Sequence, residues 1–161
     1  MDLATYVATY PPVPPRRSVS NEDERRHLGE ADGVRELAGP PAFASERNVP
    51  SRKGDTGCHL WVIQHTSIPY VCEYEQVVPP LQSGRVTHTN LTGGGAASFG
   101  GELWIDPIDD NHLYVNGCSG RYGPQTETQL NDAVVVLETR GYAVTSFGWD
   151  HDTAAPAMVL R

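Results

Sequence analysis

The sequence predicts an α+β domain with a mainly antiparallel or mixed sheet of about six strands and one well-defined C-terminal amphipathic helix. Short β-branched and aromatic runs, separated by Gly, Pro and Asn, occupy residues 58–116. One later segment has the 3.6-residue apolar period of a helix, and another apolar run follows it. Because most links between the early runs have hairpin length, we expect antiparallel neighbours among them.

The chain divides by composition at residue 57. Its 161 residues fit one domain, or one domain with a tail, and 16 Gly with 13 Pro indicate many loops. We expect residues 1–57 to be a Pro-rich, extended or partly helical segment and residues 58–161 to be the α+β domain. Residues 20–37 allow a short polar helix with Ser20 as its N-cap.

The four prolines of residues 10–17 predict a polyproline II segment, since proline fixes φ and cannot continue a helix. The segment also contains a PxxPxR pattern, which aromatic-lined SH3-type grooves accept. It is therefore a candidate contact for a protein partner. The plainer alternative is a stiff spacer.

The expected strands follow from β-branched and aromatic enrichment or from alternation of apolar and polar residues. They span 59–63, 68–74, 85–91, 101–106, 112–116 and 142–148. Between the last two lies the helix, for which Thr126 is the expected N-cap and Gln129 completes a capping box. Gly141 follows Arg140 and is the expected residue just beyond the helix end.

Charge excludes whole classes of partner. The net charge is −8, and residues 58–161 hold only 4 basic against 11 acidic residues. Such a surface repels phosphate backbones and anionic lipids, so we expect no nucleic-acid and no membrane partner. The first 15 residues lack a basic and then apolar signal pattern. We therefore expect a cytoplasmic protein, or an effector delivered without a classical signal peptide.

Cysteine and histidine spacing gives no metal site. Cys58, Cys72 and Cys118 contain no CxxC pair, which favours reduced thiols over a disulfide framework or a zinc site. Cys118 as a nucleophile is the alternative. Histidines on neighbouring strands do not have the spacing of a ligand motif, so we expect no metal.

Polar side chains among glycines mark the candidate site. His88 titrates near neutrality, and Thr89 and Asn90 follow it as small donors and acceptors. Gly93 to Gly95 come next and let a backbone approach a ligand closely. This chemistry suits a nucleotide or a small polar substrate. The structural alternative is a strand that ends in a flexible loop.

Two further segments add charged groups. Glu102 follows two glycines at a strand start, where a carboxylate can serve as general base or bind a ribose hydroxyl. Ser119, Arg121 and Tyr122 lie directly before the helix. An isolated Arg in an acidic half is expected to pair with an anionic ligand or with a carboxylate of the chain. For Glu102 the alternative is an edge carboxylate that faces water.

Topology predicts that these groups meet. If strands 85–91 and 112–116 flank strand 101–105, their C-terminal ends lie at one edge of the sheet. His88 and Arg121 then reach the same cleft as Glu102. The helix start at Thr126 is expected to add free N–H groups at or near this edge, which favour an anion.

The same segments resemble a known family, the C-terminal domain of plant IQ-motif calmodulin-binding proteins and related fungal and bacterial effector-like proteins. That family shows a Trp-containing strand, then His-Ser-Ser-Phe, Ala-Gly-Glu and Ser-Gly-His-Tyr ahead of a helix. The matching text here is Leu60-Trp61-Val62-Ile63, Thr87-His88-Thr89-Asn90-Leu91, Gly100-Gly101-Glu102-Leu103 and Ser119-Gly120-Arg121-Tyr122. Arg121 replaces the family's His, and no IQ motif is present, so calmodulin is not an expected partner.

The layout of this family is similar to ADP-ribosyltransferase folds, and the resemblance implies an enzyme that uses NAD to modify a protein or small molecule. It implies His88, Glu102 and Arg121 as catalytic residues. It implies Thr89, Asn90, Ser119 and Tyr122 as cofactor-binding residues. Two alternatives stay open. One is a non-catalytic protein-binding module that uses the Pro-rich segment and acidic face, and the other is a small hydrolase or tailoring enzyme with His88 as base.

Overall fold

The structure is a computed structural model that describes residues 1–17, 19, 21–43 and 57–159. The predicted α+β class is confirmed. The helices are α1 (Leu3–Thr9), α2 (Glu22–Arg25) and α3 (Glu127–Thr139), with 3₁₀ turns η1 (Glu30–Asp32) and η2 (His88–Leu91). The strands are β1 (Arg35–Glu36), β2 (His59–Ile63), β3 (Pro69–Cys72), β4 (Phe99–Ile105), β5 (His112–Val115), β6 (Ala143–Ser146), β7 (Trp149–Asp150) and β8 (Ala155–Pro156). No helix in the described ranges is long and apolar enough to cross a membrane.

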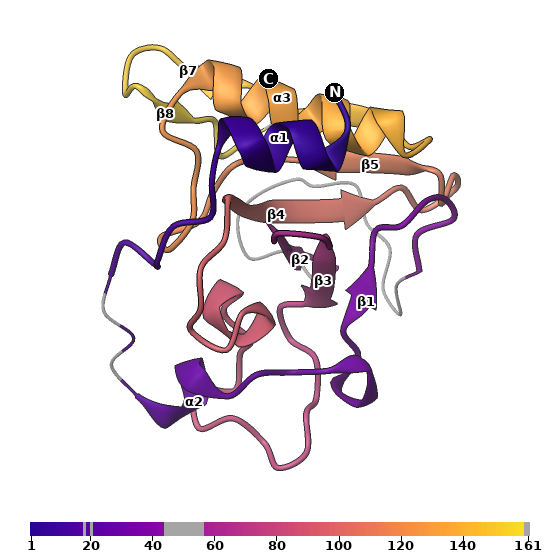
Figure 1. The fold of residues 1–161 in the computed structure, drawn as a ribbon. Coiled ribbons are helices and arrows are strands. Elements are labelled where there is room, and N and C mark those ends of the chain that lie inside the picture. Colours follow the sequence, from indigo (N-terminus) through magenta and orange to yellow (C-terminus); the bar gives the residue numbers. More distant parts are fainter. Residues whose placement is uncertain (18, 20, 44–56, 160–161) are drawn as a thin grey trace.

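Six strands form one mixed sheet in the order β1-β3-β2-β4-β5-β6. All neighbours are antiparallel except β5 and β6, which run parallel. A parallel pair cannot be joined by a hairpin, and α3 supplies the crossover between these two strands. Figure 1 shows α1 and α3 side by side over one side of the sheet, with α2 far from them. β7 and β8 form a separate two-stranded sheet.

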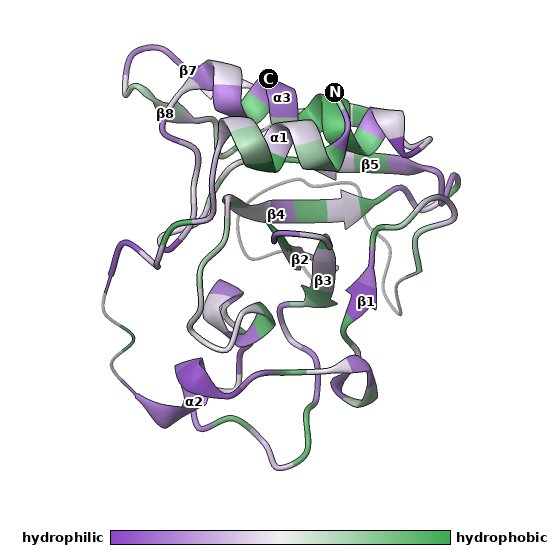
Figure 2. Cartoon of the chain, in the orientation of Figure 1, coloured by the Kyte–Doolittle hydropathy of each residue, from purple (hydrophilic) through white to green (hydrophobic). Residues whose placement is uncertain are grey.

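Both faces of the sheet are buried, and β2 shows how the sequence achieves this. Its five residues are all buried, and successive side chains point to opposite faces. Trp61 and Ile63 join the larger apolar cluster, which includes α1 and α3 side chains. Leu60 and Val62 join a second cluster on the opposite face, which includes Leu91 of η2. In Figure 2 apolar colour marks parts of α1, α3 and the central strands, whereas α2 and β1 are hydrophilic.

Part of the N-terminal segment belongs to the first cluster. Tyr6 of α1 is completely buried there, and its hydroxyl donates to the Gln129 carbonyl of α3 at 3.3 Å. The Tyr10 hydroxyl donates to Asp132 of the same helix at 2.7 Å. Farther along, Val13 forms an isolated β-bridge with Ala97. These contacts tie the Pro-rich segment, which composition sets apart, to the same core as α3.

The predicted strand at 85–91 is wrong, because residues 88–91 form η2. The Asn90 side-chain oxygen accepts hydrogen bonds from the Thr87 backbone N–H at 2.8 Å and from its hydroxyl at 2.9 Å. Such local bonds offer the backbone a turn in place of a sheet ladder. The neighbours of β4 are therefore β2 and β5, and residues 85–91 do not flank it.

The predicted helix over residues 20–37 is much shorter than expected. It is reduced to α2, whose N-cap is Asn21 with its side chain accepting from the Glu24 N–H at 2.9 Å. Ser20, the expected cap, lies outside the described residues. Gly33 then takes a φ of 85°, a conformation that favours glycine and ends η1.

The predicted N-cap and C-terminal glycine of α3 are confirmed, but the predicted capping box is wrong, because the Gln129 Oε1 accepts from the Gln125 N–H at 2.8 Å and not from the Thr126 N–H. The Thr126 hydroxyl oxygen accepts from the Gln129 N–H at 3.1 Å, as expected of an N-cap. Gly141, directly after Arg140, has a φ of 99°. An L side chain is strained there, so glycine is the residue that lets the chain turn into β6.

Replacing Tyr6 with Ala tests whether the N-terminal helix belongs to the core. The change removes a completely buried ring and its bond to α3. We expect the free energy of unfolding, measured by urea denaturation, to fall by about 3–5 kcal/mol. The control is Tyr74→Ala, since that ring is 43% exposed. Equal losses for the two variants would contradict the packing described here.

Candidate functional site

A cleft of about 600 Å³ lies on the face of the sheet turned away from α1 and α3. Its lining includes His88, Glu102, Ser119 and Arg121, which the sequence singled out, and also Arg17 and Arg85. Another cavity, about 520 Å³, lies beside β1 and contains none of the predicted site residues. The first cleft is therefore the candidate site.

Gly100 lets the parts of the site come together. It lies in β4 two residues before Glu102. A methyl group on Gly100 would stand 2.9 Å from the Tyr122 Cβ, 3.1 Å from the Ser119 Oγ and 3.3 Å from the His88 Cδ2. The loop that carries Ser119 and the turn that carries His88 thus both pack directly on the β4 backbone. Any side chain at Gly100 would push them away.

The His88 ring is a neutral hydrogen-bond acceptor. It is 8% exposed, and its Nε2 lies 2.8 Å from the Gly101 carbonyl oxygen. A carbonyl only accepts, so Nε2 carries the hydrogen and Nδ1 keeps a free lone pair. No residue in the described ranges bonds to Nδ1. Burial lowers the pKa of His88 to about 4, so the ring is uncharged at neutral pH.

Glu102 is held by Asn116, a completely buried residue that is not among the site residues predicted from the sequence. The Asn116 Nδ2 donates to the Glu102 carboxylate at 3.0 Å. Its Oδ1 accepts from the backbone N–H groups of Glu102, at 3.0 Å, and Cys118, at 2.9 Å. One amide therefore fixes both the carboxylate and the start of the neighbouring loop. An Asn at a strand end, directly before Gly117, was the available signal.

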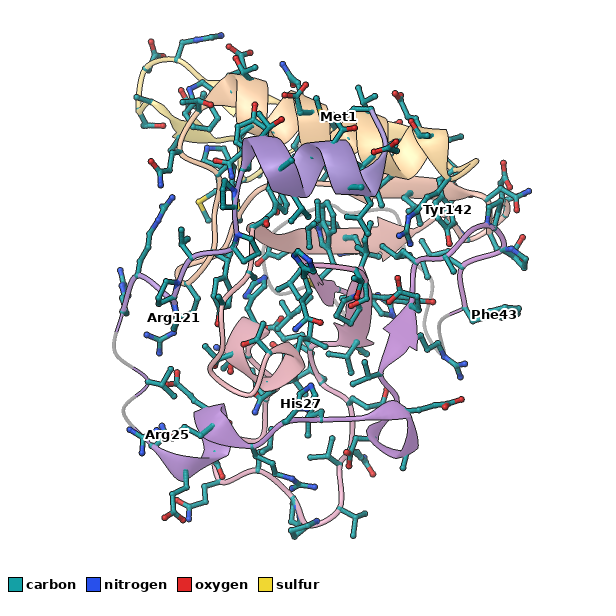
Figure 3. All side chains as sticks on the ribbon, in the orientation of Figure 1. Met1, Arg25, His27, Phe43, Arg121 and Tyr142 are labelled. Carbon is teal, nitrogen blue, oxygen red and sulfur yellow. The ribbon has the colours of Figure 1, made fainter. Side chains whose placement is uncertain are left out.

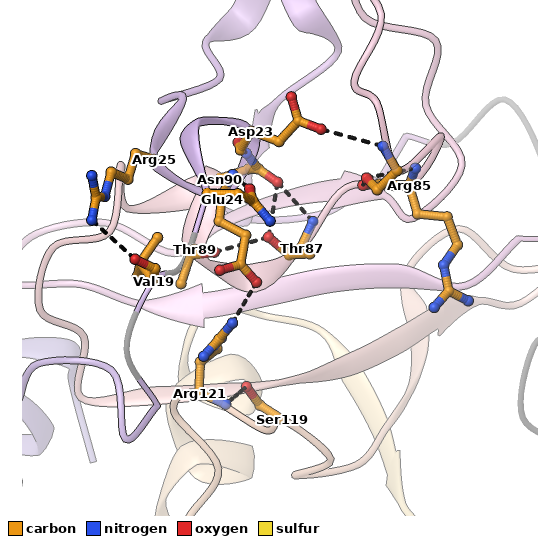
Figure 4. Close-up of polar contacts among 12 residues, drawn as sticks. Val19, Asp23, Glu24, Arg25, Arg85, Thr87, Thr89, Asn90, Ser119 and Arg121 are labelled. Atoms are coloured by element: carbon orange, nitrogen blue, oxygen red, sulfur yellow. Dashed lines mark hydrogen bonds and ion pairs between the residues drawn. The ribbon is translucent and has the colours of Figure 1, made fainter.

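Arg121 reaches the cleft already paired with a carboxylate of the chain. Its guanidinium donates to Glu24 of α2, and both side chains are more than four-fifths buried. Figure 4 shows this contact beside Ser119, whose Oγ accepts from the Tyr122 N–H at 3.1 Å and the Arg121 N–H at 3.3 Å. Figure 3 places Arg121 on the side of the molecule opposite Phe43. The Arg121–Glu24 ion pair thus joins two segments that are far apart in the sequence.

Three predicted ligand-binding residues do not line the cleft. Thr89 is completely buried, and Asn90 is 1% exposed with its amide donating to the Asp23 and Arg26 carbonyls. The Tyr122 hydroxyl donates to the Gly95 carbonyl at 2.8 Å. Their polar atoms hold loops together, because buried donors and acceptors need partners. The geometry gives Thr89, Asn90 and Tyr122 supporting positions and not direct contacts with a ligand.

The start of α3 does not line the cleft either. Thr126 borders a different cavity, which Tyr10 and Ser98 also line. The expectation that this helix terminus adds N–H groups to the site is therefore not met. Cys118 does line the cleft, whereas Cys58 is buried in a small apolar cluster. Within the part of the chain that the structure describes, no three His, Cys, Asp or Glu side chains form a metal-binding group.

No protein-family model matches the chain, and neither a curated protein nor a solved structure matches it.

The burial of His88 predicts that the folded state loses stability in acid. The pKa of His88 is about 4 in the folded state against an ordinary value of 6.5, so the unfolded chain binds a proton first as the pH falls. The stability that neutral, buried His88 contributes is fully present above pH 6.5 and is lost progressively between pH 6.5 and 4. The loss from His88 is on the order of 3 kcal/mol.

Urea denaturation across this pH range, on the natural chain and on His88→Gln, measures the effect. The variant is expected to lose less stability on acidification than the natural chain. His65→Gln is the control, since His65 is exposed, and it should follow the natural chain. Identical pH profiles for all three proteins would show that His88 is not buried as described.

Proposed function

We propose that the chain is a small transferase of the ADP-ribosyl type, with the cleft as its active site and NAD as the donor. The observation that carries this proposal is the meeting of His88, Glu102 and Arg121 in one cleft, although Arg121 lies 33 residues after His88 in the sequence. The cleft volume of about 600 Å³ lies within the range of small-molecule and cofactor sites.

The residues of the cleft fit NAD in chemical type. Glu102 and the Nδ1 of His88 are acceptors for ribose hydroxyls, and Arg17 and Arg85 are donors for phosphates. When bound, NAD supplies an ADP-ribosyl group: the bond from ribose C1′ to nicotinamide breaks, nicotinamide keeps the electron pair, and the acceptor atom bonds to C1′ and loses its proton.

In this proposal Glu102 is the principal catalytic residue. Positive charge develops on the ribose as the glycosidic bond breaks, and a fixed carboxylate lowers the energy of that charge. Asn116 holds the carboxylate in place before any ligand arrives, so little reorganisation is needed. Because folding already fixes the Glu102 side chain, binding loses little further conformational entropy there.

His88 orients a hydroxyl in this proposal and carries no charge. Its Nδ1 accepts a hydrogen bond, while its Nε2–H is committed to the Gly101 carbonyl. A neutral ring does not compete with Arg121 for an anion and does not repel the developing positive charge on the ribose. Arg121 contributes charge near the phosphates and stays tied to Glu24.

A non-catalytic binding module is the second candidate, and internal pairing of the polar groups supports it. Arg121 already has a carboxylate partner, and the amide of Asn90 is used within the fold. Residues 10–17 offer less to a partner than expected. Arg16 of the PxxPxR pattern donates from its backbone to the Arg121 carbonyl at 3.0 Å and from its guanidinium to the Gly123 carbonyl at 2.5 Å.

Glu102→Gln separates the two candidates. The variant keeps the shape of the side chain and removes its charge, so we expect nicotinamide release from NAD to fall by about 100-fold or more. Mass spectrometry of candidate acceptors would show the modified product with the natural chain only. Glu138→Gln is the control, since Glu138 is exposed on α3, away from the cleft.

The transferase proposal is abandoned if the natural chain releases no nicotinamide and binds no NAD at millimolar concentration in calorimetry. It is also abandoned if the Glu102 and Glu138 variants retain equal activity.

A further inference from the structure

We infer that Arg17 and Arg85 form a phosphate subsite at the rim of the cleft, and that the group bound there belongs to a phosphorylated sugar whose hydroxyls face Glu102 and His88. This inference deepens the proposed function by assigning a substrate class and two residues. Its test is independent of catalysis.

Arg85 has donors to spare. Its side chain is 57% exposed, and its guanidinium lies 5.9 Å from the ring centre of Tyr74. The nearest carboxylate oxygen, on Glu73, is 3.6 Å away, which is an ion pair but longer than a hydrogen bond. Its bond to the Tyr74 hydroxyl is 3.5 Å long. A guanidinium has five N–H donors, so most of these remain available to a ligand.

Arg17 is the second rim cation. It is exposed, and it has no hydrogen bond or ion pair to any residue in the described ranges. It comes from the N-terminal segment, directly after Arg16, which is bound to the loop that carries Arg121. Arg17 and Arg85 therefore approach the cleft from different segments of the chain, yet both line it.

The distribution of charge makes these cations significant. The chain carries a net charge of −8, and only four of the residues in 58–161 are basic. Two of those four, Arg85 and Arg121, line this one cleft, and Arg17 joins them. Glu73 and Glu102 also line the cleft, so its three arginines outnumber its two carboxylates, and this local excess of cations favours an anion there over the rest of the acidic surface.

The floor of the cleft, where Glu102 and the buried His88 lie, requires a ligand group other than phosphate. Glu102 and the Nδ1 of His88 are both acceptors, so the part of a ligand that reaches them must donate. Ammonium groups would be repelled by the rim arginines, whereas neutral hydroxyls are not. Acceptors at the floor and cations at the rim together select a molecule with hydroxyls at one end and a phosphate at the other.

Calorimetry with ribose 5-phosphate tests the inference directly, and ribose and inorganic phosphate are the comparison probes. Ribose 5-phosphate is expected to bind at least about tenfold more tightly than either comparison probe. It alone offers both a phosphate to the rim arginines and hydroxyls to the acceptors at the floor. Arg85→Gln is expected to weaken its binding by about tenfold.

Arg35→Gln is the matched control. Arg35 also lies over an aromatic ring, at 6.0 Å from the centre of Phe43, but it lines other cavities. Its replacement should leave ribose 5-phosphate binding unchanged. Equal weakening by both substitutions would show general attraction to charge and overturn the subsite.

Three further outcomes would decide on the subsite or on the transferase proposal. Inorganic phosphate binding as tightly as ribose 5-phosphate would overturn the assignment of hydroxyls to the floor, and no binding of ribose 5-phosphate would overturn the whole inference. Binding that depends on Arg85, in a protein that releases no nicotinamide from NAD, would support the subsite while removing the transferase proposal.

Discussion

The site depends on the absence of side chains at Gly100 and Gly101, near the start of β4. On the cleft face, Gly100 leaves room for the His88 ring and the Ser119 loop. On the other face, a methyl group at Gly101 would stand 2.1 Å from the Asn116 carbonyl oxygen and 3.0 Å from the Trp61 indole nitrogen. Glycine weakens an isolated strand, but here it lets neighbouring segments contact the backbone directly.

Two properties of the cleft follow from this close approach. His88 is buried against β4, which removes it from water and keeps it neutral, with one nitrogen bound to Gly101. Asn116, at the end of β5, reaches both the backbone and the carboxylate of Glu102. The polar groups are thus oriented by the fold before a ligand binds, which is the arrangement that favours electrostatic stabilisation of developing charge.

Sequence reasoning identified the parts of the fold that depend on local patterns. The apolar period of α3, its Thr126 cap and the run that forms β2 were predictable because each is encoded in consecutive residues. The segment at 85–91 was mistaken for a strand, since alternation does not reveal that Asn90 bonds to the Thr87 backbone. The order of the sheet was therefore only partly foreseen.

Contacts between residues far apart in the sequence limited how much of the site could be predicted. His88, Glu102 and Arg121 were expected in one cleft, and all three line it, although β2 takes the place beside β4 that residues 85–91 were expected to occupy. The partner of Arg121 is Glu24, 97 residues away, and no spacing rule links them. The support of Asn116 was missed for the same reason, because its role appears only once β4 and β5 are paired.

The most direct measurement is a long-range proton–nitrogen NMR spectrum of the His88 ring across the pH range 5 to 8. We expect a ring protonated at Nε2 and bare at Nδ1, with no titration midpoint in that range, because the pKa is about 4. In Gly100→Ala the ring should be displaced, and its pKa should move toward 6.5. A His88 that titrates near 6.5 in the natural chain would contradict the packing of His88 on the two glycines.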